Sequence, residues 1–195
     1  MNRRTTIRKQ EYVTGYPMSK LVDLDQFRTE QTAKRGFAGW HKRYGDPFSP
    51  ETRLTHLSNI IIRELAEPGE DSATIYYELI MGTFNLGSVH KFEFLNPKDR
   101  LHISDVHLFL TDLVRYEMMF RIQWISGYTC QDRSLMDLVV NFDPSDYSRY
   151  SNPPQLSRCH PQFDAFAKRI AREKEVMLRQ LHREALAKFN ATFSF

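Results

Sequence analysis

The stretch SDVHLFLTDLVRYEMMFRIQWI, residues 104–125, is the longest apolar-rich segment of the chain, and it decides the fold class. No glycine or proline interrupts it before Gly127, and Ser104 is of a residue type that caps helices. At 100° per residue, its apolar side chains fall into two strips. A helix that is apolar on two sides is packed on by several neighbours. We therefore expect a buried central helix over about residues 104–126.

Charged side chains stand between the two apolar strips. Asp112 precedes Arg115 by three residues and Glu117 precedes Arg121 by four, so each pair can meet on the helix surface. These charges are ion pairs on partly exposed seams, an oligomer contact, or the lining of a polar pocket between helices, because buried charges are almost always paired. Five ionised side chains in this stretch also argue against a membrane span. The candidates for the polar pocket are Glu78, Asp112, Arg115 and Glu117.

Periodicity and capping residues predict further helices on both sides of the central one. We expect them over about residues 19–35, 49–67, 71–86, 134–142 and 161–189, with a long loop over 143–160. Residues 88–103 fit a short strand or a loop with a helical turn. The predicted fold is therefore mainly α: a single-domain bundle over residues 17–195, with five or six helices around the buried central helix.

The helix expected over residues 71–86 carries two residues of interest. Gly82 permits a close approach by a neighbouring helix. Glu78 stands among apolar residues in IYYELIM. It points to solvent, pairs with an arginine of the central helix, or sits in an apolar setting of the kind that makes a carboxyl group a general acid or base.

The net charge of +3 hides an uneven distribution. Residues 1–44 carry ten Lys and Arg against four Asp and Glu, residues 45–154 carry nine against sixteen, and residues 155–195 carry eight against four. The basic ends either fold back on the acidic middle or present a surface for nucleic acid or another acidic partner. The first residues, 1–16, read as a basic flexible arm.

Basic and aromatic residues alternate in KRGFAGWHKRYGDP, residues 34–47. Rings can stack on bases while cations meet phosphates, which is the chemistry of single-stranded nucleic-acid recognition. The alternative is a loop whose Phe37 and Trp40 enter the core while the cations remain in water. The candidates for binding nucleic acid or another anion are Arg3, Arg4, Arg8, Lys9, Lys34, Arg35, Trp40, His41, Lys42 and Arg43.

No pattern indicates catalysis, a metal or a cofactor, so we assign no catalytic residue and expect none of these groups. His102, Asp105 and His107 are metal-ligand types, but histidines five residues apart do not share a helix face. Cys130 and Cys159 lack CxxC spacing and read as free thiols. With no secretory signal visible, we expect a cytoplasmic protein without a membrane partner.

The helix expected over residues 161–189 would be roughly 42 Å long at 1.5 Å per residue. Its end either projects and packs on a partner chain or packs within its own domain. We therefore predict a non-enzymatic interaction or adaptor protein, oligomeric or part of a larger assembly, whose C-terminal helix contacts a protein partner. The alternatives are a nucleic-acid or anion binder and, second, an enzyme or small-ligand binder with the polar pocket.

Overall fold

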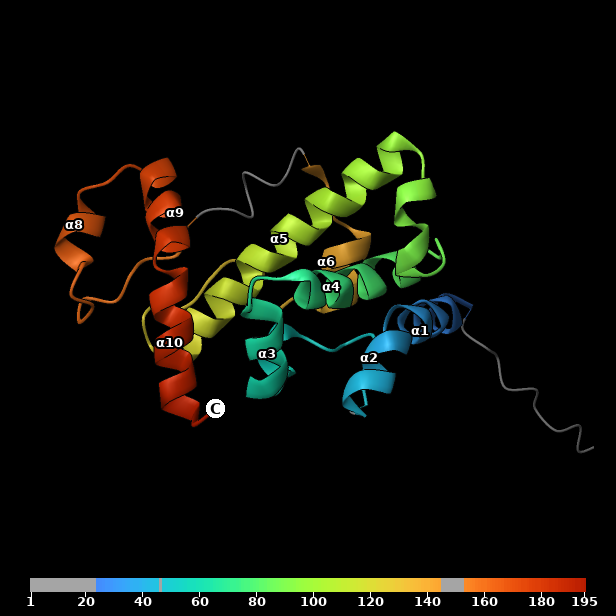
Figure 1. Ribbon diagram of the computed structural model, residues 1–195, viewed down its shortest axis with the longest axis horizontal. Coiled ribbons are helices and arrows are strands. Elements are labelled where there is room, and N and C mark those ends of the chain that lie inside the picture. The colour runs from blue at the N-terminus through green and yellow to red at the C-terminus, as the bar shows by residue number, and fades with distance from the viewer. Residues whose placement is uncertain (1–23, 46, 145–152) are drawn as a thin grey trace, which may run out of the picture.

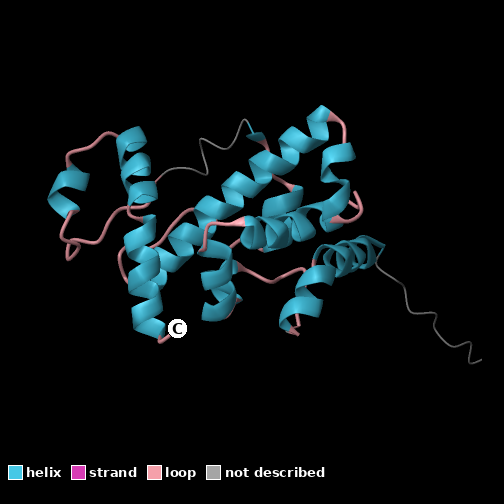
Figure 2. Cartoon of the chain, in the orientation of Figure 1, coloured by secondary structure: helices cyan, strands magenta, loops and turns pink. Residues whose placement is uncertain are grey.

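The computed structural model describes residues 24–45, 47–144 and 153–195, and these residues are mainly helical, with no β-strand among them (Figures 1 and 2). The mainly α fold class is therefore confirmed. Helices α8, α9 and α10 lie at one end of the molecule, α1 and α2 lie at the other, and α5 runs between them (Figure 1). The predicted arm over residues 1–16 lies outside the described residues.

Helix α5, Pro97–Arg121, is the predicted central helix with different ends. It begins seven residues before Ser104, because Asn96 caps it by accepting a hydrogen bond from the Asp99 N–H at 2.9 Å and proline fits its first turn. It stops before residue 126 because Gln123 adopts a left-handed φ of 62°. Helices α3, α4 and α10 pack against it, as its two apolar strips require.

Helices α1, Leu24–Gly36, and α4, Glu70–Thr83, cross closely. A Cβ at Gly82 would lie 2.5 Å from the carbonyl oxygen of Arg35, so the predicted role of Gly82 in close approach is confirmed. Helix α2, Ala38–Tyr44, also packs against α4.

The single helix predicted over residues 49–67 is wrong. The chain forms the 3₁₀ helix η1, Leu54–His56, and then α3, Asn59–Ala66. The break arises because Leu57 is extended and Ser58 starts a new helix by accepting a hydrogen bond from the Ile61 N–H.

Residues 88–103 form no strand. They contain the 3₁₀ helix η2, Val89–Phe94, and the first turns of α5. The helix predicted over residues 134–142 is present as α6, Leu135–Val140, and Ser134 caps it. Of the predicted loop over 143–160, residues 145–152 lie outside the described residues, and Leu156 bridges to Ile125 in the segment that follows α5.

The long helix predicted over residues 161–189 is also wrong. The chain forms α8, Phe163–Ala167, then α9, Ala171–Gln180, and then α10, His182–Phe193. The break before α9 arises because Ile170 is extended, with ψ of 163°, and exposed to solvent. The apolar face of α10 packs on α3 and α5, where Ala185 and Phe189 are fully buried. This face is therefore covered by its own chain, as one of the two alternatives predicts.

Candidate functional site

The four side chains predicted to line one polar pocket lie at three separate places. Asp112 and Arg115 face α9, Glu117 faces η1 and α3, and Glu78 faces α2. The ion pairs predicted from their spacing, Asp112 with Arg115 and Glu117 with Arg121, are both formed. The structure thus supports the ion pairs and does not bring the four side chains together.

Asp112 is the centre of an ion-pair network that joins α9 to α5. Only 8% of its surface is exposed, and Arg115 contacts it from the next turn of α5. Arg179 of α9 donates from Nη2 to Oδ2 of Asp112 at 2.7 Å and, from the same atom, to Glu175 at 2.7 Å. Among the described residues, the carboxylates of Asp112 and Glu175 thus meet the guanidinium groups of Arg115 and Arg179, and such pairing is how a protein accommodates a buried carboxylate.

His182, the first residue of α10, lies close to this network. Its Nε2 is 2.7 Å from the carbonyl oxygen of Ala66, which identifies Nε2 as the protonated nitrogen. Burial is the main cause that lowers the pKa of His182, and the positive charge of Arg115 lowers it further. The imidazole is therefore held in its neutral form near neutral pH.

Glu117 connects α5 to the N-terminal half of the chain. It is 1% exposed, and its carboxylate accepts hydrogen bonds from Arg121 Nε at 2.6 Å and from the Tyr128 hydroxyl at 2.8 Å. Arg121 continues to Asn59 Oδ1 at 2.7 Å and the Leu54 carbonyl oxygen at 3.0 Å. Burial, together with the negative charge of Glu117, raises the pKa of the Tyr128 hydroxyl. These partners satisfy the carboxylate, so Glu117 holds elements together.

Glu78 of α4 is half-buried beside α2. Its Oε2 atom is buried and has no hydrogen-bond partner among the described residues. A Cβ at Gly39 would lie 2.5 Å from this oxygen, so a larger residue at position 39 would require the Glu78 side chain to move. Glu78 therefore packs under α2, and no described arginine of α5 binds its Oε2.

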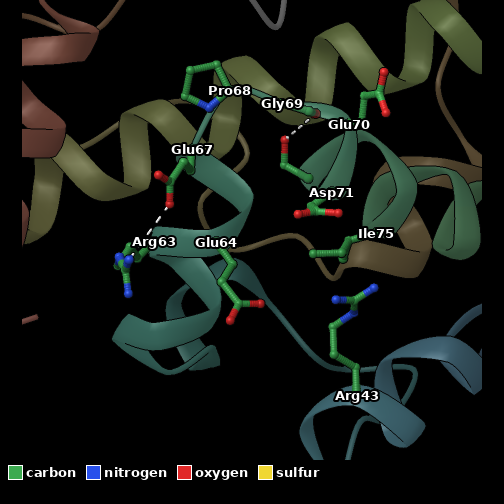
Figure 3. A pocket seen from close by; sticks show the side chains of 10 residues that line it. Arg43, Arg63, Glu64, Glu67, Pro68, Gly69, Glu70, Asp71 and Ile75 are labelled. Carbon is green, nitrogen blue, oxygen red and sulfur yellow. Dashed lines mark hydrogen bonds and ion pairs between the residues drawn. The ribbon is translucent and has the colours of Figure 1, made fainter.

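A polar cleft of about 550 Å³ opens between α2, α3 and the start of α4 (Figure 3). Arg43 points into it from α2, opposite the start of α4 (Figure 3). Glu64 accepts a hydrogen bond from the Tyr44 hydroxyl at 2.9 Å, and burial beside this carboxylate raises the pKa of Tyr44. Glu70 and Asp71 lie in the first turn of α4, where the helix dipole favours negative charge. Each of these three carboxylates therefore has a structural role: Glu64 accepts a hydrogen bond, and Glu70 and Asp71 interact favourably with the dipole of α4.

The basic and aromatic residues of the 34–47 stretch separate onto different sides. Phe37 and Trp40 are buried, and Trp40 Nε1 donates to the carbonyl oxygen of Ile75 at 3.0 Å. Trp40 therefore cannot stack on a base, and the alternative that both rings enter the core is the correct one. Residues 34–44 belong to α1 and α2, with a turn at Phe37, rather than to a loop. Five candidate cations remain exposed: Lys34, Arg35, His41, Lys42 and Arg43. The candidates Arg3, Arg4, Arg8 and Lys9 lie outside the described residues.

The outer face of α5 has two halves. The covered half, Asp112 and Arg115, lies under α9. The open half, Leu101, Asp105 and Leu108, has no such cover among the described residues: Leu101 is 64% exposed and Leu108 is 58% exposed. Residues four and seven apart share a helix face, so the three side chains form one stripe.

A cleft of about 360 Å³ adjoins the open half. Asp105 and Leu108 line it from α5, Phe142 and Pro144 from the segment after α6, and Arg179 from α9. Phe94, at the end of η2, is 87% exposed, and an ion pair of 3.5 Å between Glu93 and Arg100 holds the end of η2 beside the first turns of α5. The i, i+7 spacing of the leucines could have indicated this surface, but the predicted helix began after Leu101.

Among the described residues, no three His, Cys, Asp or Glu side chains lie close enough to bind one metal ion. His102 instead contacts the ring of Phe84 at 5.3 Å, and His107 contacts that of Tyr76 at 5.0 Å. None of the described helices is both long enough and apolar enough to span a membrane.

Comparison with known proteins does not add a family: no family model matches the sequence, and no similarity to a curated protein or to a solved structure is found.

Proposed function

We propose that this chain is a non-enzymatic interaction protein that binds an amphipathic helix of a partner protein on the open half of α5. The observation that carries the proposal is the exposure of Leu101 and Leu108, at 64% and 58%, on one face of an otherwise buried helix. Contiguous exposed apolar surface bordered by polar groups is typical of protein-binding sites. Helix-in-groove recognition uses anchors at this spacing.

The charge of the open half indicates which helix fits. Asp112 and Asp105 lie seven residues apart on the same face of α5. Asp112 forms an ion pair with Arg179 of α9. The carboxylate of Asp105 forms no ion pair with any described residue. A partner helix lying beside α9 would therefore place an arginine or lysine at Asp105 and apolar side chains on Leu101 and Leu108.

The cleft beside Leu108 gives such a helix an anchor. Its 360 Å³ volume and its walls of Phe142 and Pro144 accept one large apolar side chain. Buried anchors of this kind carry most of the binding energy in protein interfaces. This proposal moves the partner surface away from the C-terminal helix, because α3 and α5 cover the apolar face of α10.

The test is selection of helical peptides from a displayed library on the whole protein. We expect the selected peptides to carry a basic residue with one apolar residue four positions away on one side and another apolar residue three positions away on the other side. Their affinity should fall at least tenfold for the Leu101→Lys, Leu108→Lys double variant and remain unchanged for Ile60→Lys, which alters an isoleucine that is 54% exposed on α3. The Asp105→Arg variant should select acidic peptides instead.

Two outcomes would overturn the proposal. One is a peptide set whose binding the leucine variants do not alter. The other is a set that shows no reversal of charge with Asp105→Arg. If the wild-type protein is a dimer in light scattering and the leucine variants are monomers, the occupant is a second copy of the chain rather than a different protein.

A further inference from the structure

Helix α1 packs on the rest of the fold with one side only. Ala33 and Gly36 are buried on this inner side, and a Cβ at Gly36 would lie 2.5 Å from Oγ1 of Thr83 on α4. At 100° per residue, an arc of about 100° directly opposite carries exposed side chains of α1 itself. We call these four residues the outer face of α1: Leu24, Phe27, Lys34 and Arg35.

The first turn of α1 supplies the apolar part of the outer face. Leu24 is 64% exposed and Phe27 is 49% exposed, and residues three apart are neighbours on a helix surface. One exposed apolar side chain on a soluble protein needs no explanation. Two adjacent ones on a helix that is otherwise polar leave a contiguous apolar surface in water.

The last turn of α1 supplies the basic part. Among the described residues, neither Lys34 nor Arg35 has an ion-pair partner, and Arg35 donates from Nη2 to the neutral hydroxyl of Thr32 at 3.3 Å. Glu30, four residues before Lys34, accepts a hydrogen bond from Gln26 Nε2 at 3.0 Å instead. The helix dipole favours cations in a last turn, which explains their position but does not cancel their charge.

An occupant of this face has to cover apolar surface at one end and neutralise cations at the other. Residues 1–23 carry five Lys and Arg against two Asp and Glu, so like charge opposes their packing on Lys34 and Arg35. The phosphates of nucleic acid would meet the cations but would leave Leu24 and Phe27 in water. A helix that lies on a membrane is apolar along its whole length, whereas this face is apolar in its first turn alone.

We propose that the outer face of α1 binds an acidic amphipathic helix of a partner protein. Apolar side chains of that helix cover Leu24 and Phe27, and its carboxylates pair with Lys34 and Arg35, about 15 Å further along the axis at 1.5 Å per residue. Apolar anchors bordered by charged pairs are the usual composition of a protein interface.

This surface is separate from the partner-helix site on α5, because α1 lies at the opposite end of the molecule from α9 (Figure 1). The two surfaces also differ in charge: Asp105 on α5 selects a basic helix, and Lys34 and Arg35 on α1 select an acidic one. A chain with both surfaces would link two different proteins.

The test selects helical peptides from a displayed library on the whole protein that carries Leu101→Lys and Leu108→Lys, so that the α5 surface does not contribute. We expect peptides of net negative charge, with two neighbouring apolar residues and, about ten positions away, two or more Asp or Glu. Their affinity should fall as salt rises from about 50 to 300 mM.

Two variants of this protein separate the apolar and basic parts. Leu24→Ser, Phe27→Ser and Lys34→Gln, Arg35→Gln should each lower the affinity of the selected peptides by about tenfold or more. The matched controls alter exposed residues elsewhere and should leave the affinity unchanged: Ile60→Ser for the first variant, and Lys168→Gln, Lys188→Gln for the second. Because every altered side chain is exposed, urea midpoints should match the parent protein, which separates lost binding from lost folding.

Three results would overturn the proposal. One is a selected set without net negative charge, and another is a set whose affinity the Leu24→Ser, Phe27→Ser variant does not change. The third is a labelled DNA duplex that binds more tightly than the peptides and depends on Lys34 and Arg35 but not on the apolar pair, which would identify nucleic acid as the occupant. Because the selection is made without the α5 leucines, it succeeds or fails independently of the partner-helix site.

Discussion

The covered and open halves of the outer face of α5 resemble each other in sequence and differ in environment. Each half contains an aspartate, and Asp105 and Asp112 are seven residues apart on one face. Asp112 is buried and paired because α9 lies over it and supplies Arg179. Asp105 lies between two exposed leucines. The same helix face is therefore a structural contact where the chain covers it and a candidate binding surface where it does not.

The largest expected effect comes from truncating one leucine in each environment. Leu178 of α9 is fully buried, whereas Leu108 of the open half is 58% exposed. Leu178→Ala should lower the free energy of unfolding by about 2 to 5 kcal/mol, because it leaves a cavity. Leu108→Ala should lower it by less than about 1 kcal/mol. Urea denaturation measures both, and equal losses would show that the open half is covered in solution.

Replacing Asp112 should likewise destabilise the protein more than replacing Asp105, although the difference should be smaller than for the two leucines. Asp112→Ala removes the carboxylate that Arg115 and Arg179 share, so we expect a loss of about 2 to 3 kcal/mol, reduced by the partial exposure of Arg179 and by its ion pair with Glu175. Asp105→Ala should change stability by no more than about 0.5 kcal/mol. The double variant Asp112→Ala, Arg179→Ala should lose less than the sum of its single variants. Full additivity would contradict the ion pair as the contact between α9 and α5.

Low pH should lower the free energy of unfolding through His182, which lies close to the covered half. The pKa of His182 is below its usual 6.5 in the folded protein, so the unfolded chain binds the proton first. The contribution of His182 to stability is therefore complete above pH 6.5 and decreases as the pH falls from there toward the folded-state pKa. The variant His182→Asn lacks the contribution of His182 and keeps those of His107 and His160. It should therefore lose less stability than the wild type between pH 7.5 and pH 5. Parallel pH profiles would contradict the assignment.

The smallest effect on stability belongs to the open half itself. Leu101→Lys and Leu108→Lys each replace an exposed leucine, so we expect changes within about 0.5 kcal/mol. Denaturant midpoints should match those of the wild type while the selected helical peptides lose their affinity. A large drop in the midpoint would mean that these leucines stabilise the fold.

Several features follow from local sequence because their causes are local. The buried central helix follows from two apolar strips, the pair Glu117–Arg121 from i, i+4 spacing, and the cap of α6 from Ser134. The helix breaks at Leu57 and Ile170 could not be predicted from the sequence, because apolar periodicity continues through both residues although their backbones are extended. Burial of these stripes against several neighbours outweighs the loss of a few helical hydrogen bonds.

The amino-acid sequence by itself determined the helical class, the apolar strips of α5 and the ion pairs within single helices, because each depends on residues that lie near one another along the chain. Only the tertiary structure decided that Trp40 is buried, that Glu78 packs under α2 and that the C-terminal helix is covered by its own chain. It also decided that Arg179, 67 residues away from Asp112 in sequence, covers one half of the α5 face and leaves Leu101 and Leu108 exposed. The physical reason is that burial depends on which distant element packs on a face, and helical periodicity shows only which face needs a partner.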